Sequence, residues 1–321
     1  MARGEERALR RRIRSIQSIK KITRAMELIS ATRVTSAQQR AAAARPYSEH
    51  ITDVIQNLAE AGGLIEHPLL RSVETIRRVA FVIITSDRGL AGAYNSNVLR
   101  AAERELQARR AEGADYSLVL LGKKAESYFR FRGYKIEAAF SGMSDMPTYE
   151  NAREVATVVR TQFEREEVDE VILVYTRFLS LASQRVVVRQ FLPLTGVGAE
   201  APSGLRADYE YEPAPGEILS RLLPRYVEAR LYAAMLDAAA SEHAARQRAM
   251  KAATDNAEDL IVRYTRAMNR ARQDAITTEI MEIVGGAEAL RAAHGKDEDE
   301  MVEQALRTAE ALLRQLESVN A

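Results

Sequence analysis

Apolar side chains recur along the first sixty residues at the spacing of one face of an α-helix. Residues 4 to 44 contain no proline and, after Gly4, no glycine. The apolar stripe repeats every three or four positions and consists of Ile13, Ile16, Ile19, Ile22, Met26 and Ile29. We expect Pro46 to kink or interrupt this helix, and Gly62 and Gly63 to end it. The pattern predicts an N-terminal coiled-coil helix over residues 1–60.

The middle of the chain changes to short apolar runs bounded by turn-forming residues. Three of these runs predict buried β-strands, at residues 77–85, 116–122 and 168–176. Helical patterns lie between them, at residues 96–111, 123–131 and 149–166. Residues 183–194 alternate apolar and polar positions, which indicates an antiparallel strand at a sheet edge. This order predicts a Rossmann-like α/β domain over residues 75–200.

From about Ile218 the pattern becomes helical again and stays so. There is no proline after Pro224 and no glycine between it and Gly285. Sixty residues of helix span about 90 Å, which exceeds the ~30 to 40 Å width of the middle domain. A lone helix with an apolar stripe is unstable in water, so we expect residues 208–290 to pair with the N-terminal helix as an antiparallel coiled coil. The alternative, a helical bundle folded back on itself, needs loops that these residues lack.

The far end of this predicted helix is unusually apolar. Residues 274–290 contain no lysine or arginine, and their larger apolar side chains cover more than one face: Ile276, Ile280, Met281, Ile283 and Val284. The N-terminal helix is shorter and is not expected to reach them. An exposed apolar tip marks a site for a partner, so we expect another protein to form a sleeve around it.

Residues 291–321 form an additional tail. Gly295 breaks the preceding helix, and the acidic run at 297–300 suits the start of a new one. Apolar residues then recur at helical spacing, which predicts an amphipathic helix of about twenty residues. One hypothesis is that this helix docks its leucine face on a partner protein. The other is an appendage without effect.

Composition narrows the class of protein further. The chain has 321 residues, a formal charge of +1 and no cysteine, which excludes disulfides, thiolate metal sites and a cysteine nucleophile. Its longest apolar runs are well short of the ~18 residues of a membrane span. The near-zero charge gives no global field that would favour nucleic acid or anionic lipid.

One strand-to-helix turn resembles a phosphate-binding loop at first sight. Residues 85–97, "TSDRGLAGAYNSN", supply Asp87, Arg88, Gly89, Gly92 and Asn95. They lack the GxGxxG spacing of a dinucleotide loop and the GK[ST] ending of a P-loop, so a structural turn is the simpler interpretation. The four histidines, at 50, 67, 243 and 294, lack a metal-ligand spacing, and we expect each at the surface. The sequence predicts no catalytic site, no metal and no cofactor.

The N-terminal helix is strongly basic. Between residues 3 and 24 the only acidic residues are Glu5 and Glu6. The same segment contains nine basic residues: Arg3, Arg7, Arg10, Arg11, Arg12, Arg14, Lys20, Lys21 and Arg24. Nucleic-acid binding is one interpretation, although there is no aromatic interleaving for base stacking. A solvated face of the coiled coil is the second, and a track for acidic loops of a partner is the third.

Three sequence blocks together resemble the gamma subunit of the rotary F-type ATP synthase. The first is "RRIRSIQSIKKITRAMELISATRV" at 11–34, and the second is "SDRGLAGAYNSNV" at 86–98, where the family often has cysteine in place of Ala91. The third spans 209–290, from "YEYEPAPGEIL" to "ITTEIMEIVGGAEAL". The blocks occur in the family's order. The departures are Ala91, Pro224 and the tail beyond Leu290.

The resemblance implies a central rotor shaft that couples ion-driven rotation of the membrane c-ring to ATP synthesis or hydrolysis in a ring of alpha and beta subunits. The partners it implies are the alpha, beta and epsilon subunits and the c-ring, with no nucleic acid and no direct nucleotide binding. The competing readings are a nucleotide- or cofactor-binding α/β enzyme and a basic coiled-coil adaptor that binds nucleic acid.

The resemblance also assigns contact residues. Those implied to contact the beta subunit are Lys20, Lys21, Arg24, Met26, Arg272, Gln273, Thr277 and Glu279. Those implied to face the c-ring and epsilon from the foot domain are Tyr209, Tyr211 and Glu212. The apolar tip at 276–284 is implied to lie in the apical bearing. Because the first block begins close to Met1, with no transit peptide expected before it, the resemblance favours a bacterial protein on the cytoplasmic side of the plasma membrane.

Overall fold

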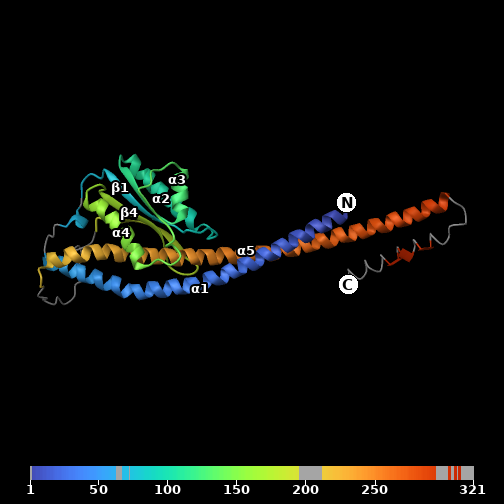
Figure 1. The fold of residues 1–321 in the computed structure, drawn as a ribbon, viewed down its shortest axis with the longest axis horizontal. Coiled ribbons are helices and arrows are strands. Elements are labelled where there is room, and N and C mark those ends of the chain that lie inside the picture. The colour runs from blue at the N-terminus through green and yellow to red at the C-terminus, as the bar shows by residue number, and fades with distance from the viewer. Residues whose placement is uncertain are drawn as a thin grey trace. The chain divides into compact units, whose positions relative to one another are not determined.

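The computed structural model describes residues 2–62, 67–71, 73–194 and 212–293, together with 303–304, 307–308 and 310–311 of the tail. The chain divides into two compact units. One consists of Met26–Met250, and the other of Met1–Ala25 with Lys251–Ala321. Two helices are continuous along both units: α1 at Ala2–Gly62 and α5 at Pro215–Ala293 (Figure 1).

The unit of residues 26–250 is built on one mixed sheet. Its strands are β1 (Arg78–Ile84), β2 (Asp115–Leu121), β3 (Ala138–Phe140), β4 (Glu170–Phe178) and β5 (Gln184–Leu192). Their order is β3-β2-β1-β4-β5, with β1 to β4 parallel and β5 antiparallel to β4. The predicted α/β fold and the antiparallel edge at 183–194 are confirmed. Strand β3 was not predicted, because three residues carry no readable period.

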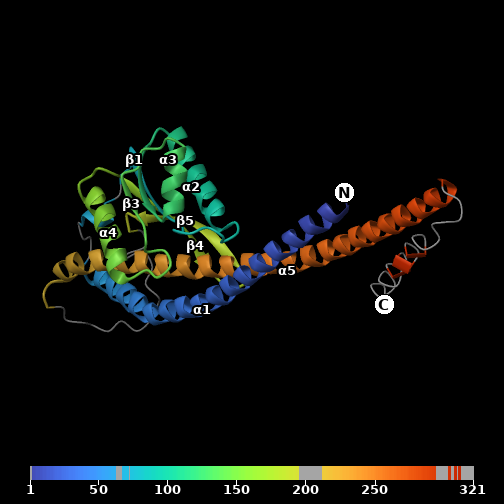
Figure 2. The same ribbon diagram turned by 45° about the vertical axis from the view of Figure 1, so that its right-hand side comes forward.

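Helices cover both faces of this sheet and give it two apolar cores. On one face lie α2 (Tyr94–Ala111) and α3 (Lys123–Phe131), side by side, which bury Phe81, Leu106 and Phe129 (Figure 2). On the other face lie α4 (Tyr149–Glu164), the short 3-10 helix η1 (Pro68–Leu70) and parts of α1 and α5. This second core contains Ile55 of α1 and Leu223 of α5, so both long helices are packed into the α/β domain.

Two prolines lie inside the long helices without ending them. Pro46 lies within α1 and Pro224 within α5. Of the two outcomes expected at Pro46, a kink or an interruption of the helix, the interruption is contradicted. A proline removes one helical hydrogen bond, but the turns after it bury Ile51, Ile55 and Leu58 almost completely. This packing holds α1 helical up to Gly62.

In the other unit the ends of the two long helices pair antiparallel. The Thr23 and Thr254 hydroxyls lie 2.8 Å apart in a buried position. One turn away, Lys20 Nζ lies 2.7 Å from a carboxylate oxygen of Glu258. As residue numbers rise along α1 they fall along α5, which confirms the predicted antiparallel coiled coil.

The residues that form this seam differ from the predicted apolar stripe. Ile13 and Thr23 are buried, whereas Ile19 and Ile22 are 50% and 59% exposed. A step of three residues falls about 60° short of a full turn, so three such steps place Ile22 about 180° around the helix from Ile13. Alternating steps of three and four, which keep to one side, connect residues 13, 16, 20 and 23 instead. The prediction of a single apolar face is therefore wrong.

The start of α4 offers a local test of this fold. The Thr148 hydroxyl accepts a hydrogen bond from the Asn151 amide, and the Asn151 side chain accepts one from the Thr148 amide. We expect Thr148→Ala to lower the free energy of unfolding by about 1 kcal/mol, since it leaves helix N–H groups without a cap. Thr157→Ala, an exposed change inside the same helix, is the control and should change it by less. Urea denaturation measures both, and equal effects would contradict a capping role.

Candidate functional site

The β1–α2 turn uses its polar groups to hold the loops around it. The Asn95 carbonyl accepts hydrogen bonds from the amide and hydroxyl of Ser86. The Asp87 carboxylate accepts from the backbone amides of Lys123, Gly142 and Ser144. These polar groups are hydrogen-bonded to one another and to neighbouring loops. The turn therefore has the geometry of a structural turn, as the sequence indicated.

Helix α5 covers the carboxyl edge of the sheet next to this turn. Ligands of open α/β sheets bind at that edge, where the strand order reverses. Here the Tyr94 hydroxyl donates to the Ala238 carbonyl of α5, and Met235 and Ala239 line the same space. The cavity left between them is about 10 Å³, whereas small-molecule sites occupy roughly 300–1,000 Å³.

We therefore expect the isolated chain to bind ATP, ADP or NAD no better than weakly. The reason is steric, because α5 would have to leave the sheet edge before a nucleotide could enter. Isothermal titration calorimetry with each ligand measures this, with an ATP-binding enzyme as positive control. A stoichiometric site with micromolar affinity would contradict the prediction and favour the reading of a nucleotide-binding enzyme.

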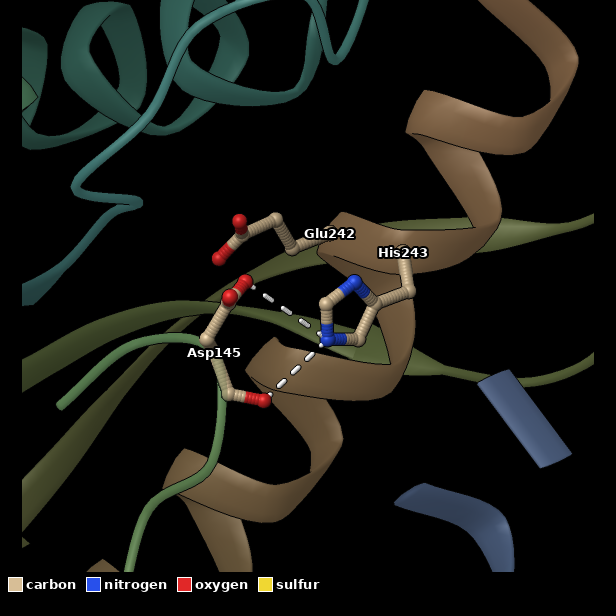
Figure 3. Close-up of side chains that lie close together, drawn as sticks. All are labelled: Asp145, Glu242 and His243. Atoms are coloured by element: carbon tan, nitrogen blue, oxygen red, sulfur yellow. Dashed lines mark hydrogen bonds and ion pairs between the residues drawn. The ribbon is translucent and has the colours of Figure 1, made fainter. Parts of the chain in front are cut away.

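A cluster of ionisable groups, buried on α5 and half-buried on its other members, lies where α5 meets the loop between β3 and α4. Figure 3 shows Glu242 and His243, from adjacent positions of α5, beside Asp145 of that loop. His243 Nε2 lies 3.1 Å from the Asp145 carbonyl oxygen and 3.8 Å from its carboxylate. Arg246 donates to Glu242 at 2.6 Å, and Arg33 of α1 donates to Asp145 at 3.0 Å. The cluster therefore joins α1, α5 and the α/β domain.

Burial is the largest influence on the pKa values of Glu242 and His243. It raises the pKa of Glu242 to about 7, although the Arg246 guanidinium acts in the opposite direction. It lowers the pKa of His243, which keeps the imidazole neutral at physiological pH. His243 is 1% exposed, so the prediction that every histidine lies at the surface is wrong for this one.

The same three residues could in principle hold a metal ion, since their ligand atoms lie within 4.8 Å of one another. Both carboxylates, however, already accept from guanidinium groups. A cation added beside Arg246 and Arg33 would meet two positive charges at short range. The arrangement is that of a structural network in which each carboxylate is paired with a guanidinium.

The implied contact residues for the beta subunit lie in two groups along the helices. Lys20, Lys21 and Arg24 lie on α1, and Lys20 is paired with Glu258, whose pKa it lowers. Arg272, Gln273, Thr277 and Glu279 lie on α5. Fourteen residues of helix, about 21 Å, separate Glu258 from Arg272, so the structure does not bring the two groups together. Met26 is half-buried on α1.

The apolar tip and the foot residues are described in part. Met281 is 67% exposed, and Ile276, Ile280, Ile283 and Val284 are half-buried. Glu212 is exposed, whereas Tyr209 and Tyr211 lie outside the described residues. The same holds for the apolar positions of the predicted tail helix, although its described residues 303–304, 307–308 and 310–311 are helical.

The sequence pattern did not lead us to predict that a row of apolar side chains on α1 faces outward. Ile19, Ile22, Leu28 and Ile29 are each at least half exposed. Their spacing is the signal that could have found them, because apolar residues at three-residue steps cannot all face one partner helix. In the described ranges, no helix has the length and hydropathy of a membrane span.

Comparisons with known proteins agree with this architecture. A model of the ATP synthase family matches residues 5–290. The ATP synthase gamma chain of Frankia casuarinae is 52% identical over 293 residues, covering 89% of this chain and 98% of that protein. The gamma chain of a Nocardioides species is 49% identical over 299 residues, covering 91% and 98%.

Two solved structures share the fold at low sequence identity. A chain of the Euglena gracilis mitochondrial ATP synthase, from an assembly of OSCP, F1 and c-ring, has a TM-score of 0.67 at 20% identity and covers 92% of this chain and 99% of its own length. A chain of the Tetrahymena thermophila central stalk and c-ring has a TM-score of 0.56 at 22% identity, covering 72% and 99%. Given a family match over most of its length and relatives that share about half of its residues, the chain belongs to the gamma chains of ATP synthase.

Proposed function

We propose that this chain is the central rotor shaft of an F-type ATP synthase and carries no catalytic site of its own. It couples ion-driven rotation of a c-ring to ATP synthesis or hydrolysis in a ring of alpha and beta subunits. The observation that supports this most directly is the combination of family membership with a paired helical shaft that leaves apolar and basic side chains facing outward, among them Ile19, Ile22 and Lys21.

The contacts with the catalytic ring follow from this role. Lys20, Lys21, Arg24 and Met26 of α1, with Arg272, Gln273, Thr277 and Glu279 of α5, contact the beta subunits. Ile276, Ile280, Met281, Ile283 and Val284 lie in the apical bearing, where an exposed methionine and half-buried aliphatic side chains suit an apolar sleeve. An asymmetric shaft presents a different face to each beta subunit as it turns and so biases the binding state of each.

The α/β domain is the foot of the rotor in this proposal. Tyr209, Tyr211 and Glu212 face the c-ring and the epsilon subunit. The chain is then a peripheral protein on the cytoplasmic side of a bacterial plasma membrane, which it reaches through its partners. The domain boundaries follow the same division: shaft helices at 1–60 and 208–290, the foot at 75–200 and the tail at 291–321.

Charge reversal on α1 tests this function in the assembled complex. We expect Lys20→Glu, Lys21→Glu and Arg24→Glu together to reduce ATP hydrolysis and coupled proton pumping severalfold, because cations facing acidic loops shape the energy profile of rotation. The fold should remain, because Lys21 and Arg24 are exposed and the Lys20–Glu258 ion pair is only partly buried, and such charges contribute little to stability. Reversal of Arg100, Arg104 and Lys135, three exposed cations of the α/β domain, is the matched control.

Circular dichroism and ATPase assays on membrane vesicles give the readouts. Unchanged hydrolysis, torque and pumping in the triple variant would leave these cations as a solvated face and contradict the assigned contact. A salt-dependent shift with duplex DNA, absent with an acidic peptide, would instead support the nucleic-acid adaptor.

A further inference from the structure

Helix α5 buries several small side chains shortly before the unit ends at Met250. Five of its buried residues from 234 to 250 are alanines, and the larger aliphatic side chains among them are Met235, Leu236 and Met250; the alanines are Ala234, Ala238, Ala239, Ala240 and Ala244. Methyl groups gain dispersion energy from close packing, but they make no directional bonds. Alanine packing alone therefore gives a helix little resistance to turning about its own axis.

On one side, two polar side chains of α5 bind β4 and the turn that follows it. The Ser241 hydroxyl donates to the Thr176 carbonyl at 3.1 Å. Arg248 Nη1 donates to the carbonyls of Leu181 and Ala182 at 2.6 and 3.1 Å. These carbonyls belong to the backbone, so the bonds hold α5 to the frame of the domain.

On the other side, two further side chains bind separate loops. Arg246 donates to the Gly89 carbonyl of the β1–α2 turn, from both Nε and Nη2 at 3.4 Å. His243 lies 3.1 Å from the Asp145 carbonyl oxygen, and Asp145 in turn accepts from Arg33 of α1. Figure 3 shows the His243–Asp145 contact. Through Asp145 and Arg33, α1 is tied to the same stretch of α5.

The spacing of these four residues places them on opposite sides of the helix. Ser241 and Arg248 are seven residues apart, about two full turns, so they point the same way. His243 follows Ser241 by about 200°, and Arg246 lies about 60° from His243. Rotation of α5 in either sense would lengthen hydrogen bonds on both sides at once.

We propose that Ser241, His243, Arg246 and Arg248, which we call the α5 collar, form a torsional clamp. The clamp fixes the rotational setting of α5 in the α/β domain, so that torque on the domain passes to the part of α5 beyond Met250. This role rests on the proposed rotor function and deepens it by naming positioning residues for torque transmission.

Single-molecule rotation of the complete complex can measure the stiffness of this clamp. The catalytic ring is immobilised, and a bead is attached to the α/β domain through Phe131→Cys, a position 89% exposed in a chain without other cysteines. The clamp variant carries Glu242→Gln, Arg246→Met and Arg248→Met, which removes two collar contacts and leaves no buried unpaired charge. We expect about a two- to threefold larger variance of the bead angle during catalytic pauses, since two of the four collar residues, and four of their six hydrogen bonds to backbone carbonyls, are lost.

An engineered disulfide between α5 and the α/β domain should reverse the effect of the clamp variant on the bead angle. A merely structural role of the collar residues does not predict this reversal. A Cβ built on Gly92 of the β1–α2 turn lies 3.7 Å from Cβ of Ala249, which is within the range of disulfides. Gly92→Cys and Ala249→Cys are added to the clamp variant, which is oxidised before the bead is attached. Gly92 has φ +56°, so the cysteine there carries backbone strain, which is present in the reduced and the oxidised variant alike. Oxidation should restore the variance of the wild type, and reduction should remove the rescue.

A milder variant and a control complete the design. Arg248→Met alone changes an exposed side chain and should increase the variance by a smaller factor. Arg221→Met is the control, because Arg221 is 77% exposed and pairs with Glu217 of its own helix. If the wild type rotates but neither clamp variant broadens the distribution, the clamp is refuted and the rotor function stands. If beads on the wild type do not rotate during ATP hydrolysis, the rotor function itself fails.

Discussion

Replacing Arg246 with methionine is expected to lower the free energy of unfolding by about 3–5 kcal/mol, the range found when one partner of a buried ion pair is removed. Glu242 and Arg246 are 1% and 6% exposed, and their side chains lie 2.6 Å apart. Without the guanidinium, the Glu242 carboxylate must either stay charged in an apolar setting or take up a proton. Chemical denaturation in urea measures the loss.

The double variant Glu242→Gln with Arg246→Met is the control for this prediction. It removes both charges and keeps side chains of similar volume, so it should be clearly more stable than Arg246→Met alone. Equal losses in the two variants would show that packing of the arginine stem, and not the unpaired carboxylate, accounts for the effect.

The pH dependence of the stability of Arg246→Met follows from the direction in which the pKa of Glu242 is shifted. Burial raises the pKa of Glu242 to about 7 in the folded protein, from an ordinary value of 4.5. The folded state therefore binds this proton more tightly than the unfolded state, and the stability it contributes is greatest below about pH 4.5 and is lost as the pH rises through about 7. Removing Arg246 raises the pKa further, so Arg246→Met should lose more stability at pH 8 than at pH 6.

Gly122→Ala is expected to destabilise the α/β domain by more than about 3 kcal/mol, through a clash combined with backbone strain. Gly122 has φ +93° at the junction of β2 and α3, and a Cβ there would lie 2.4 Å from the Thr85 carbonyl oxygen. Thr85 cannot move aside easily, because its hydroxyl donates to Leu121 and accepts from the Ala125 amide.

Gly113→Ala is the matched control for the clash. Gly113 has nearly the same backbone angle, φ +92°, but nothing lies within 4 Å of its added Cβ. Its substitution should therefore cost only the strain of an L-residue with positive φ, about 1–2 kcal/mol. Thermal unfolding of the two variants compares them directly. Similar losses of stability in the two variants would show that the backbone angle alone accounts for the effect, without a contribution from the clash with Thr85.

The sequence carried enough information for the α/β fold because the runs that form β1, β2 and β4 are mostly apolar. The run at 77–85 predicts β1 closely, since a strand covered on both faces is apolar at successive positions. The turn at 85–97 could be interpreted as structural because the glycine spacing of a phosphate loop is missing. The contact residues of the shaft came from the family resemblance, and they remain predictions.

The buried charges could not be predicted, for a physical reason. Glu242 and Arg246 are four residues apart in a helix, which is also the spacing of ordinary solvent-exposed ion pairs. Their burial depends on the loops that contain Gly89 and Ser144, which are distant in sequence. Similarly, the outward position of Ile22 depends on which turn of α1 faces Thr254, and an apolar count along one helix does not contain that information.

The Thr23–Thr254 pair has a consequence for how uniquely the two shaft helices align. Both hydroxyls are buried, and each lies within hydrogen-bonding distance of the other. The Thr23 hydroxyl also lies 3.1 Å from the Lys20 carbonyl of its own helix. If one helix slid past the other by a turn, the hydrogen bond between the helices would be lost, at a cost of about 0.5–1.5 kcal/mol. A pair of leucines would bind more tightly but would tolerate the slip, much as apolar positions in coiled coils tolerate several alignments while one polar position selects among them. The threonines therefore act against misaligned assembly. They lower the affinity between the helices, but they select one alignment, which gives every copy of the shaft the same length.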